Sequence, residues 1–452
     1  MTSVRWNHRG QPKIKPARHA VTALAAVVLA LLTLGCLMER SSAETTRPHL
    51  TVALPAGLSP RTIGFYLAQQ EGYFTSRNIT IDFITSTTQT PSRLLADGKA
   101  DLAVDLMPVA LRLHQDGTAI RHVAQFFQHS SLALYCRPPI SKPTDLHGTT
   151  IGVWFGGEES SFYAWMSELN ISTFGEEDGV TVLRQGRVAA ALADARLDCV
   201  TSTSYLAPLQ MQASGIAPGS RKVFPYDDLH VGTLEDGLYA RAGDLDNKDR
   251  VELFSRFLAA SSRGWQKLHD DEASALRLLQ SRSDLDIEQA DRALDAGGPT
   301  DTGMITANDK KRDATAKADA SQGKKSSQQA KTTPTRPAAL ATGGTAGNPS
   351  ATDKTAAATT GQAPDGQTAG KPGHQPDLAA LKASLDAVDA LIDPSHNKIG
   401  VLDADSYDRT VNLLLTGAPE PVLRSAPEDA ISDVLLKNLA QAAAPAAAPT
   451  TP

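Results

Sequence analysis

Short apolar runs alternate with stretches of helical periodicity from Pro48 onward. The runs have the length of buried strands, and the stretches between them repeat apolar residues every third or fourth position. This pattern predicts strands at His49 to Leu54, Ile79 to Ile84, Asp101 to Val104, Ile120 to Ala124 and Leu132 to Tyr135, and helices at Arg61 to Glu71, Pro91 to Asp97 and Pro108 to Gln115. Helices alternating with short strands predict an α/β fold with a parallel sheet and right-handed crossovers.

A second alternation begins at Thr150 and continues to about Tyr239. It predicts strands at Thr150 to Val153, Val180 to Leu183, Asp198 to Val200 and Arg221 to Phe224, and helices at Ser160 to Leu169, Gly186 to Ala195 and Ser204 to Ala213. Two α/β units joined by extended segments at both ends predict two lobes with a cleft between them.

After Asp246 the pattern becomes helical, because apolar residues recur at helical spacing. Helices are predicted at Lys248 to His269, Glu272 to Gln280, Ile287 to Leu294, Leu378 to Ile392, Ser406 to Leu415 and Pro427 to Leu439. The segment 301–377 interrupts this series and contains almost no large apolar residue. It cannot bury enough apolar surface to offset the cost of ordering its backbone, so we expect a disordered insertion there and a disordered tail at 441–452.

The N-terminus has the layout of a secretory signal peptide. Basic residues precede an apolar run from Ala20 to Met38, and Ser41-Ser42-Ala43 offers small residues for cleavage. We expect cleavage after Ala43. Two alternatives stay open: an uncleaved membrane anchor, because the run is long enough to span a bilayer, and lipidation of Cys36, which follows Gly35.

Each of these interpretations exports the chain and places Cys136 and Cys199 in an oxidising compartment. The two cysteines form either a disulfide or two separate buried apolar sites. The formal charge of the 452 residues is −6, and the basic residues form no stripe. Nucleic acid is therefore not an expected partner.

Four loops follow predicted strands and precede predicted helices, so they lie at the sheet edge where α/β proteins bind ligands. They carry hydroxyls, carboxylates, backbone N–H groups and aromatic rings, without a nucleophile paired with a base or a metal-ligand cluster. The sequence thus predicts a small-molecule receptor without cofactor, metal or catalytic residue. The candidate ligand-binding residues are Ser59, Arg61, Asp105, Met107, Trp154, Phe155, Gly156, Gly157, Glu158, Ser160, Thr201, Ser202, Thr203, Tyr205 and Asp236.

Several blocks, in this order, resemble the periplasmic solute-binding proteins of the nitrate/sulfonate/taurine and thiamine-precursor branch. They are Gln70-Glu71-Gly72-Tyr73-Phe74, the run from Leu95 to Val104, the run from Asp145 to Val153, the run from Leu234 to Tyr239, and Arg263-Gly264-Trp265. The resemblance implies a two-lobed type II periplasmic binding protein that delivers its ligand to the permease of an ABC importer.

The resemblance also divides the chain. It implies lobe one over 44–135, lobe two over 136–240, return helices of lobe one over 241–300, and C-terminal helices packing on lobe one over 378–440. Because the insertion falls among these helices, we expect it to leave the cleft intact.

The expected cleft has several carboxylates, among them Asp105, Glu235 and Asp236, but only Arg61 as a cation. Carboxylates accept hydrogen bonds from exocyclic amines, and aromatic rings stack on heterocycles, whereas an anion buried without positive partners is costly. We therefore expect a planar N-heterocycle such as a thiamine-precursor pyrimidine. The alternative is a small anion such as a sulfonate, taurine or nitrate.

Some candidate residues also have a purely structural interpretation. Trp154 and Phe155 could belong to the core, Glu158 and Glu159 could stabilise a helix N-terminus, and Asp236 could pair with Arg241. The enzymes related to this branch are pyrimidine synthases with a lysine in the first loop and a cysteine-rich motif. This chain has neither, so we do not expect an enzyme. An exported scaffold is the third alternative.

Overall fold

The structure is a computed structural model that describes residues 47–176, 178–186, 190–281, 376–393 and 399–443. The predicted signal peptide with Cys36, the predicted helix Ile287 to Leu294, the insertion apart from its last two residues, and residues 444–452 lie outside these ranges. Within the ranges, no helix combines the length and the apolar character needed to cross a bilayer.

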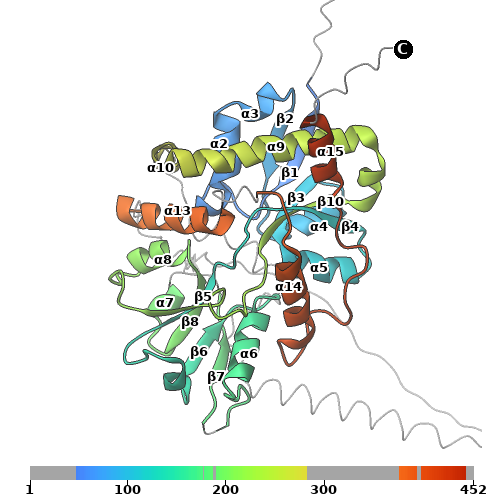
Figure 1. Cartoon of the computed structure of the whole chain (residues 1–452). Helices are drawn as coiled ribbons and strands as arrows, with labels where there is room; N and C mark the ends of the chain where they lie inside the picture. Colours follow the sequence, from blue (N-terminus) through green and yellow to red (C-terminus); the bar gives the residue numbers. More distant parts are fainter. Residues whose placement is uncertain (1–46, 177, 187–189, 282–375, 394–398, 444–452) are drawn as a thin grey trace, which may run out of the picture. The chain divides into compact units, whose positions relative to one another are not determined.

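The first lobe is built on a five-stranded sheet (Figure 1). Its strands are β1 (His49–Ala53), β2 (Thr80–Ile84), β3 (Leu102–Leu106), β4 (Ile120–Gln125) and β10 (Asp236–Arg241), in the order β2-β1-β3-β10-β4. β1 pairs in parallel with β2 and β3, whereas β10 lies antiparallel between β3 and β4. The sequence pattern did not identify β10, because the strand opens with Asp236-Gly237, residue types that are rare in strands.

The second lobe has its own five-stranded sheet, in the order β7-β6-β8-β5-β9. Its strands are β5 (Leu132–Cys136), β6 (Thr150–Val153), β7 (Thr181–Arg184), β8 (Cys199–Thr203) and β9 (Lys222–Pro225). The chain leaves the first sheet after β4, completes the second sheet and returns through β10. This topology is the two-lobed type II periplasmic binding protein fold, as predicted.

Helices flank both sheets. Lobe one carries η1 (Pro60–Thr62), α2 (Ile63–Gln70), α3 (Tyr73–Ser76), α4 (Pro91–Ala96) and α5 (Met107–Gln115), and lobe two carries η2 (Pro143–Leu146), α6 (Glu159–Glu168), α7 (Ala190–Ala193) and α8 (Ala207–Ala213). The return and C-terminal helices are η3 (Ala242–Asp246), α9 (Lys248–Asp270), α10 (Glu272–Gln280), α13 (Leu378–Ile392), α14 (Ala404–Thr416) and α15 (Val434–Ala443).

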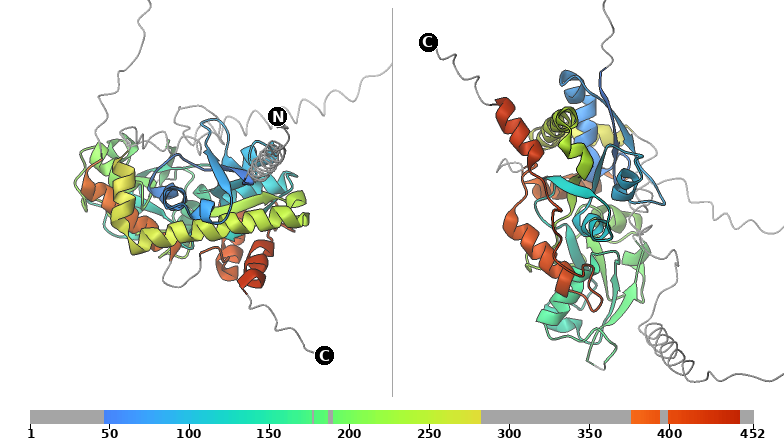
Figure 2. Two further views of the ribbon diagram at one scale, coloured as in Figure 1. Left: turned by 90° about the horizontal axis from the view of Figure 1, so that it is seen from above. Right: turned by 90° about the vertical axis from the view of Figure 1, so that its right-hand side faces the viewer.

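The long helix α9 lies along α2, with α15 beside it (Figures 1 and 2). Two glycines allow the close approach of α2 and α9. A Cβ added to Gly64 would lie 2.0 Å from the ring of Trp265, and one added to Gly264 would lie 2.0 Å from the Gly64 carbonyl. Trp265 is fully buried there, as its helical spacing predicted.

The outer edge of β4 is covered by the C-terminal segment. The N–H of His122 donates to Ala430 O, and the N–H of Ser432 donates to His122 O, both at 2.8 Å. The backbone of these residues therefore pairs with a strand, which is why α15 begins at Val434 rather than at Pro427. Covering the edge also removes a site for unwanted strand addition.

The two cysteines of lobe two form a disulfide. Cys136 in β5 and Cys199 in β8 stand directly opposite each other in the antiparallel register. Of the two alternatives left open by the sequence, the structure therefore selects the bridge.

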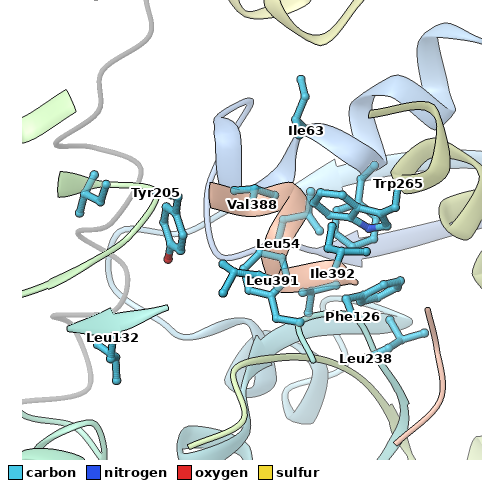
Figure 3. Packing of buried hydrophobic residues seen from close by; sticks show 14 of the residues in the cluster. Leu54, Ile63, Phe126, Leu132, Tyr205, Leu238, Trp265, Val388, Leu391 and Ile392 are labelled. Atoms are coloured by element: carbon cyan, nitrogen blue, oxygen red, sulfur yellow. The ribbon is translucent and has the colours of Figure 1, made fainter. Parts of the chain in front are cut away.

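Helix α13 packs on both lobes, whereas the sequence placed the C-terminal helices on lobe one. It contacts η1 and α9 of lobe one and α8 of lobe two. Its carboxyl end meets the crossover between the lobes, where Gln128 N–H donates to Leu391 O at 2.7 Å. Figure 3 shows Val388, Leu391 and Ile392 of this helix among buried residues of the largest core cluster.

Candidate functional site

The candidate residues lie in strands, or in the turns and first helical residues that follow strands. Ser59 and Arg61 follow β1, Asp105 and Met107 lie at the end of β3, and the remaining residues lie in or after β6 and β8 or at the start of β10. All of them are buried except Phe155 and Gly156, which are half-buried.

The lobes touch at Gly157. This residue has φ +120°, and a Cβ on it would lie 2.6 Å from the Cβ of Pro108, at the start of α5. Both the backbone conformation and the close approach require glycine. The turn before α6 therefore belongs to the contact between the lobes.

Arg61 and Asp236 form a buried ion pair within lobe one. Arg61 Nε donates to Asp236 Oδ2 at 2.8 Å, and Nη2 donates to Oδ1 at 2.5 Å. Arg241, the alternative partner suggested by the sequence, pairs with Asp244 instead. The charge of the guanidinium in the first loop is therefore balanced by a carboxylate of the protein itself.

Asp105 accepts hydrogen bonds from two backbone groups. Its Oδ2 accepts from Ser92 N–H and its Oδ1 from Leu106 N–H, both at 2.9 Å. Burial raises the pKa of this carboxyl to about 6, although the hydrogen bonds from Ser92 oppose the shift. Asp105 thus joins the end of β3 to the first turn of α4.

Glu235 forms hydrogen bonds that link the two chain segments connecting the lobes. It precedes β10, and its carboxylate accepts from Ser130 Oγ, from the N–H and hydroxyl of Ser131 and from Leu132 N–H, at 2.5–3.2 Å. Burial raises its pKa to about 7, against the lowering effect of the Ser131 hydroxyl. The sequence placed Glu235 in the cleft but not among the candidate ligand-binding residues, and its partners lie more than 100 residues away in the sequence.

The start of α6 holds a further internal carboxylate. Glu159 Oε2 accepts from Gly156 N–H at 2.9 Å and from Gly157 N–H at 2.6 Å. This contact agrees with the structural interpretation, in which an acidic residue stabilises the positive end of a helix. Glu158, the neighbouring candidate, is buried.

Several buried hydroxyls of lobe two have no hydrogen-bond partner among the described residues. They are Ser160 and Ser161 in the first turn of α6, and Thr203 in β8. Ser202 differs, because its hydroxyl donates to Gln210 Oε1 at 2.8 Å. Buried polar groups are rarely left unpaired, so these three hydroxyls are candidates for contact with a bound polar molecule.

The candidate apolar residues contact the core to different extents. Trp154 and Tyr205 are buried in the largest core cluster, where the Tyr205 ring packs 6.2 Å from that of Phe127. Met107 packs with residues of α14. Phe155 is half-buried, with the guanidinium of Arg184 5.3 Å above its ring, and is the most accessible of these aromatic rings.

Metal-binding side chains are not concentrated in the described part of the chain. No group of three or more His, Cys, Asp or Glu residues there could hold an ion.

Residues 59–275 match the family described as NMT1/THI5 like. The match covers a little under half of the chain. The matched part contains every candidate site residue and ends inside α10, so α13, α14 and α15 lie outside it. No curated protein matches this chain.

Solved structures resemble the chain at low sequence identity. A protein from Bordetella bronchiseptica RB50 is 13% identical with a TM-score of 0.47, over 88% of this chain and 98% of that chain. The periplasmic aliphatic sulphonate binding protein SsuA from Escherichia coli is 14% identical with a TM-score of 0.43, over 57% and 80%. The desulfurization enzyme DSZB is 14% identical with a TM-score of 0.44, over 88% and 100%.

Proposed function

We propose that this protein is the extracytoplasmic receptor of an ABC importer, which captures a small solute between its lobes and delivers it to a membrane permease. The fold and the family match support this role, and the predicted signal peptide is consistent with it. The observation that carries the proposal is the set of buried, unpartnered hydroxyls on lobe two.

We further propose that the ligand is a planar, uncharged N-heterocycle of the pyrimidine class. A buried oxyanion needs positive partners, and the Arg61 guanidinium is already paired with Asp236. Hydroxyls both donate and accept, so Ser160 and Thr203 suit ring nitrogens and amino groups.

The groups expected to recognise the ligand differ from those suggested by the sequence. Asp105 and Glu235 were expected to accept hydrogen bonds from ligand amines, but both accept from groups of the protein. Under this proposal the hydroxyls of lobe two take over that role.

Calorimetric titration of the purified mature chain tests both the receptor role and the proposed ligand class. Thr203→Val removes one hydroxyl at nearly constant shape and should weaken binding of 4-amino-2-methylpyrimidine derivatives about three- to tenfold, the effect of one hydrogen bond. Thr181→Val, at an exposed position of β7, is the matched control and should leave affinity unchanged.

Two outcomes would contradict the proposal. Saturable binding of taurine or nitrate, without binding of any pyrimidine, would overturn the ligand class. If native mass spectrometry of protein purified from its own host also showed no bound small molecule, and no titrated solute bound, the receptor role itself would be wrong.

A further inference from the structure

The turn that opens α6 forms a binding site for one negatively charged oxygen. Gly156 and Gly157 have φ values of +131° and +120°, and their consecutive N–H groups converge on one atom, Glu159 Oε2. Convergent backbone N–H groups at the start of a helix are a general means of holding an anion. Here the anion is a side chain of the protein.

Glu159 holds this position in the contact between the lobes. Gly157 lies against Pro108 of lobe one, and Gly417 at the end of α14 approaches Ser160 O so closely that an added Cβ would lie 2.8 Å from it. When a small solute enters between the lobes near Ser160, the N–H groups of Gly156 and Gly157 therefore already donate to Glu159.

The surroundings of the turn carry charges of both signs: Arg184 lies over the ring of Phe155, and two carboxylates lie near Tyr163. Tyr163, one turn further along α6, is mostly buried and has its pKa raised to about 12, first by burial and then by the charges of Glu159 and Glu420. A second anion at this point would be repelled by the half-buried Glu159 and, more weakly, by the exposed Glu420.

We propose that Glu159 is a specificity-determining residue: its carboxylate occupies the anion position at the start of α6 and thereby excludes small oxyanions from the cleft. This inference rests on the proposed function, because it assumes that solutes enter between the lobes. It adds a mechanism of discrimination, in which binding of an oxyanion would require displacement of a charge that the protein itself supplies.

Removing the internal carboxylate tests this mechanism. Methanesulfonate and nitrate serve as probes, and their dissociation constants are measured by calorimetry for wild type, Glu159→Ala and Glu159→Gln. We expect affinity to rise at least tenfold in Glu159→Ala. The rise should be smaller in Glu159→Gln, because the amide oxygen can still accept from Gly156 and Gly157.

Glu168→Ala is the matched control, since it removes the same charge from an exposed position at the other end of α6. It should leave anion affinity unchanged. In ¹⁵N-labelled Glu159→Ala, the amide resonances of Gly156 and Gly157 should shift on addition of methanesulfonate. Glu159→Gln keeps the test usable if Glu159→Ala does not fold.

Three results would overturn the role of Glu159: unchanged anion affinity in both Glu159 variants, an equal gain in Glu168→Ala, or tight anion binding by wild type. The pyrimidine titration of wild type is a separate measurement. If pyrimidines fail to bind while Glu159→Ala gains anion affinity, the proposed ligand class is wrong and the exclusion mechanism stands.

Discussion

Glu235 is a buried carboxylate that holds the outgoing and returning connections between the lobes together. Its raised pKa of about 7 means that the folded protein keeps a proton at pH values where the unfolded chain has lost it. This group therefore stabilises the fold at low pH, and its contribution disappears as the pH rises from about 4.5 through 7.

Between pH 6 and pH 8 the loss from Glu235 should amount to about 1 kcal/mol of unfolding free energy. Glu235→Gln keeps the shape and the acceptor oxygen but does not titrate, so denaturant titrations at both pH values should show a smaller decrease for the variant than for wild type. The comparison also cancels the effect of His122, whose pKa burial lowers to about 4. Glu168→Gln is the control, and parallel pH profiles for wild type and Glu235→Gln would contradict the assignment.

For single residues, the sequence indicated where polar groups lie but not which groups of the protein they pair with. Asp105 and Asp236 were expected among the carboxylates of the cleft; in the structure Asp105 lies in β3 and Asp236 begins β10. Their partners were not predictable, because Ser92 N–H is a backbone group of a neighbouring helix and Arg61 lies 175 residues from Asp236. Of the unpartnered hydroxyls, those of Ser160 and Thr203 were among the candidate ligand-binding residues, whereas that of Ser161 was not.

The elements of this fold follow closely from apolar spacing. The predicted range of α13 is the observed one, and α9 and α10 agree to within a residue. Differences occur where tertiary contacts override local preference. β10 is a central strand despite its Asp-Gly start, and the residues before α15 pair with β4 instead of coiling.

Helix packing gives a prediction about α2 and α9. Gly64→Ala would place a methyl group 2.0 Å from the ring of Trp265, so we expect a loss of about 3 kcal/mol in unfolding free energy from overpacking. Gly243→Ala, where nothing lies within 4 Å of the added Cβ, is the control. Thermal or urea unfolding of both variants measures the difference, and similar stabilities would show that α9 moves aside without cost.

On the scale of the whole molecule, a long segment that the sequence predicts to be an insertion joins α10 to α13. The helices on either side of it contact each other, since Lys382 Nζ bonds to Glu272 Oε2 at 2.7 Å. A linker of about ten Gly and Ser residues spans roughly 18 Å, enough to join such neighbours. Replacing residues 301–376 with this linker should therefore leave ligand affinity and melting temperature nearly unchanged.

A loss of affinity above tenfold in the linker variant, with its melting temperature preserved, would show that the segment takes part in binding. A lower melting temperature would show that it contributes to the fold. The two-lobed architecture itself was predictable from alternating strands and helices, but the position of α13 across both lobes was not. Its apolar face is compatible with either lobe, and only the three-dimensional arrangement decides between them.

The place of β10 in the first sheet has a consequence for how the protein is made. Lobe two is encoded by one continuous stretch, whereas β4 has no neighbouring strand in its own sheet until residue 236 is available. In a chain threaded across a membrane from its N-terminus, lobe two can thus become compact while lobe one is still missing a central strand. Lobe one should therefore become resistant to proteases only after β10 has been translocated and has paired with β3 and β4.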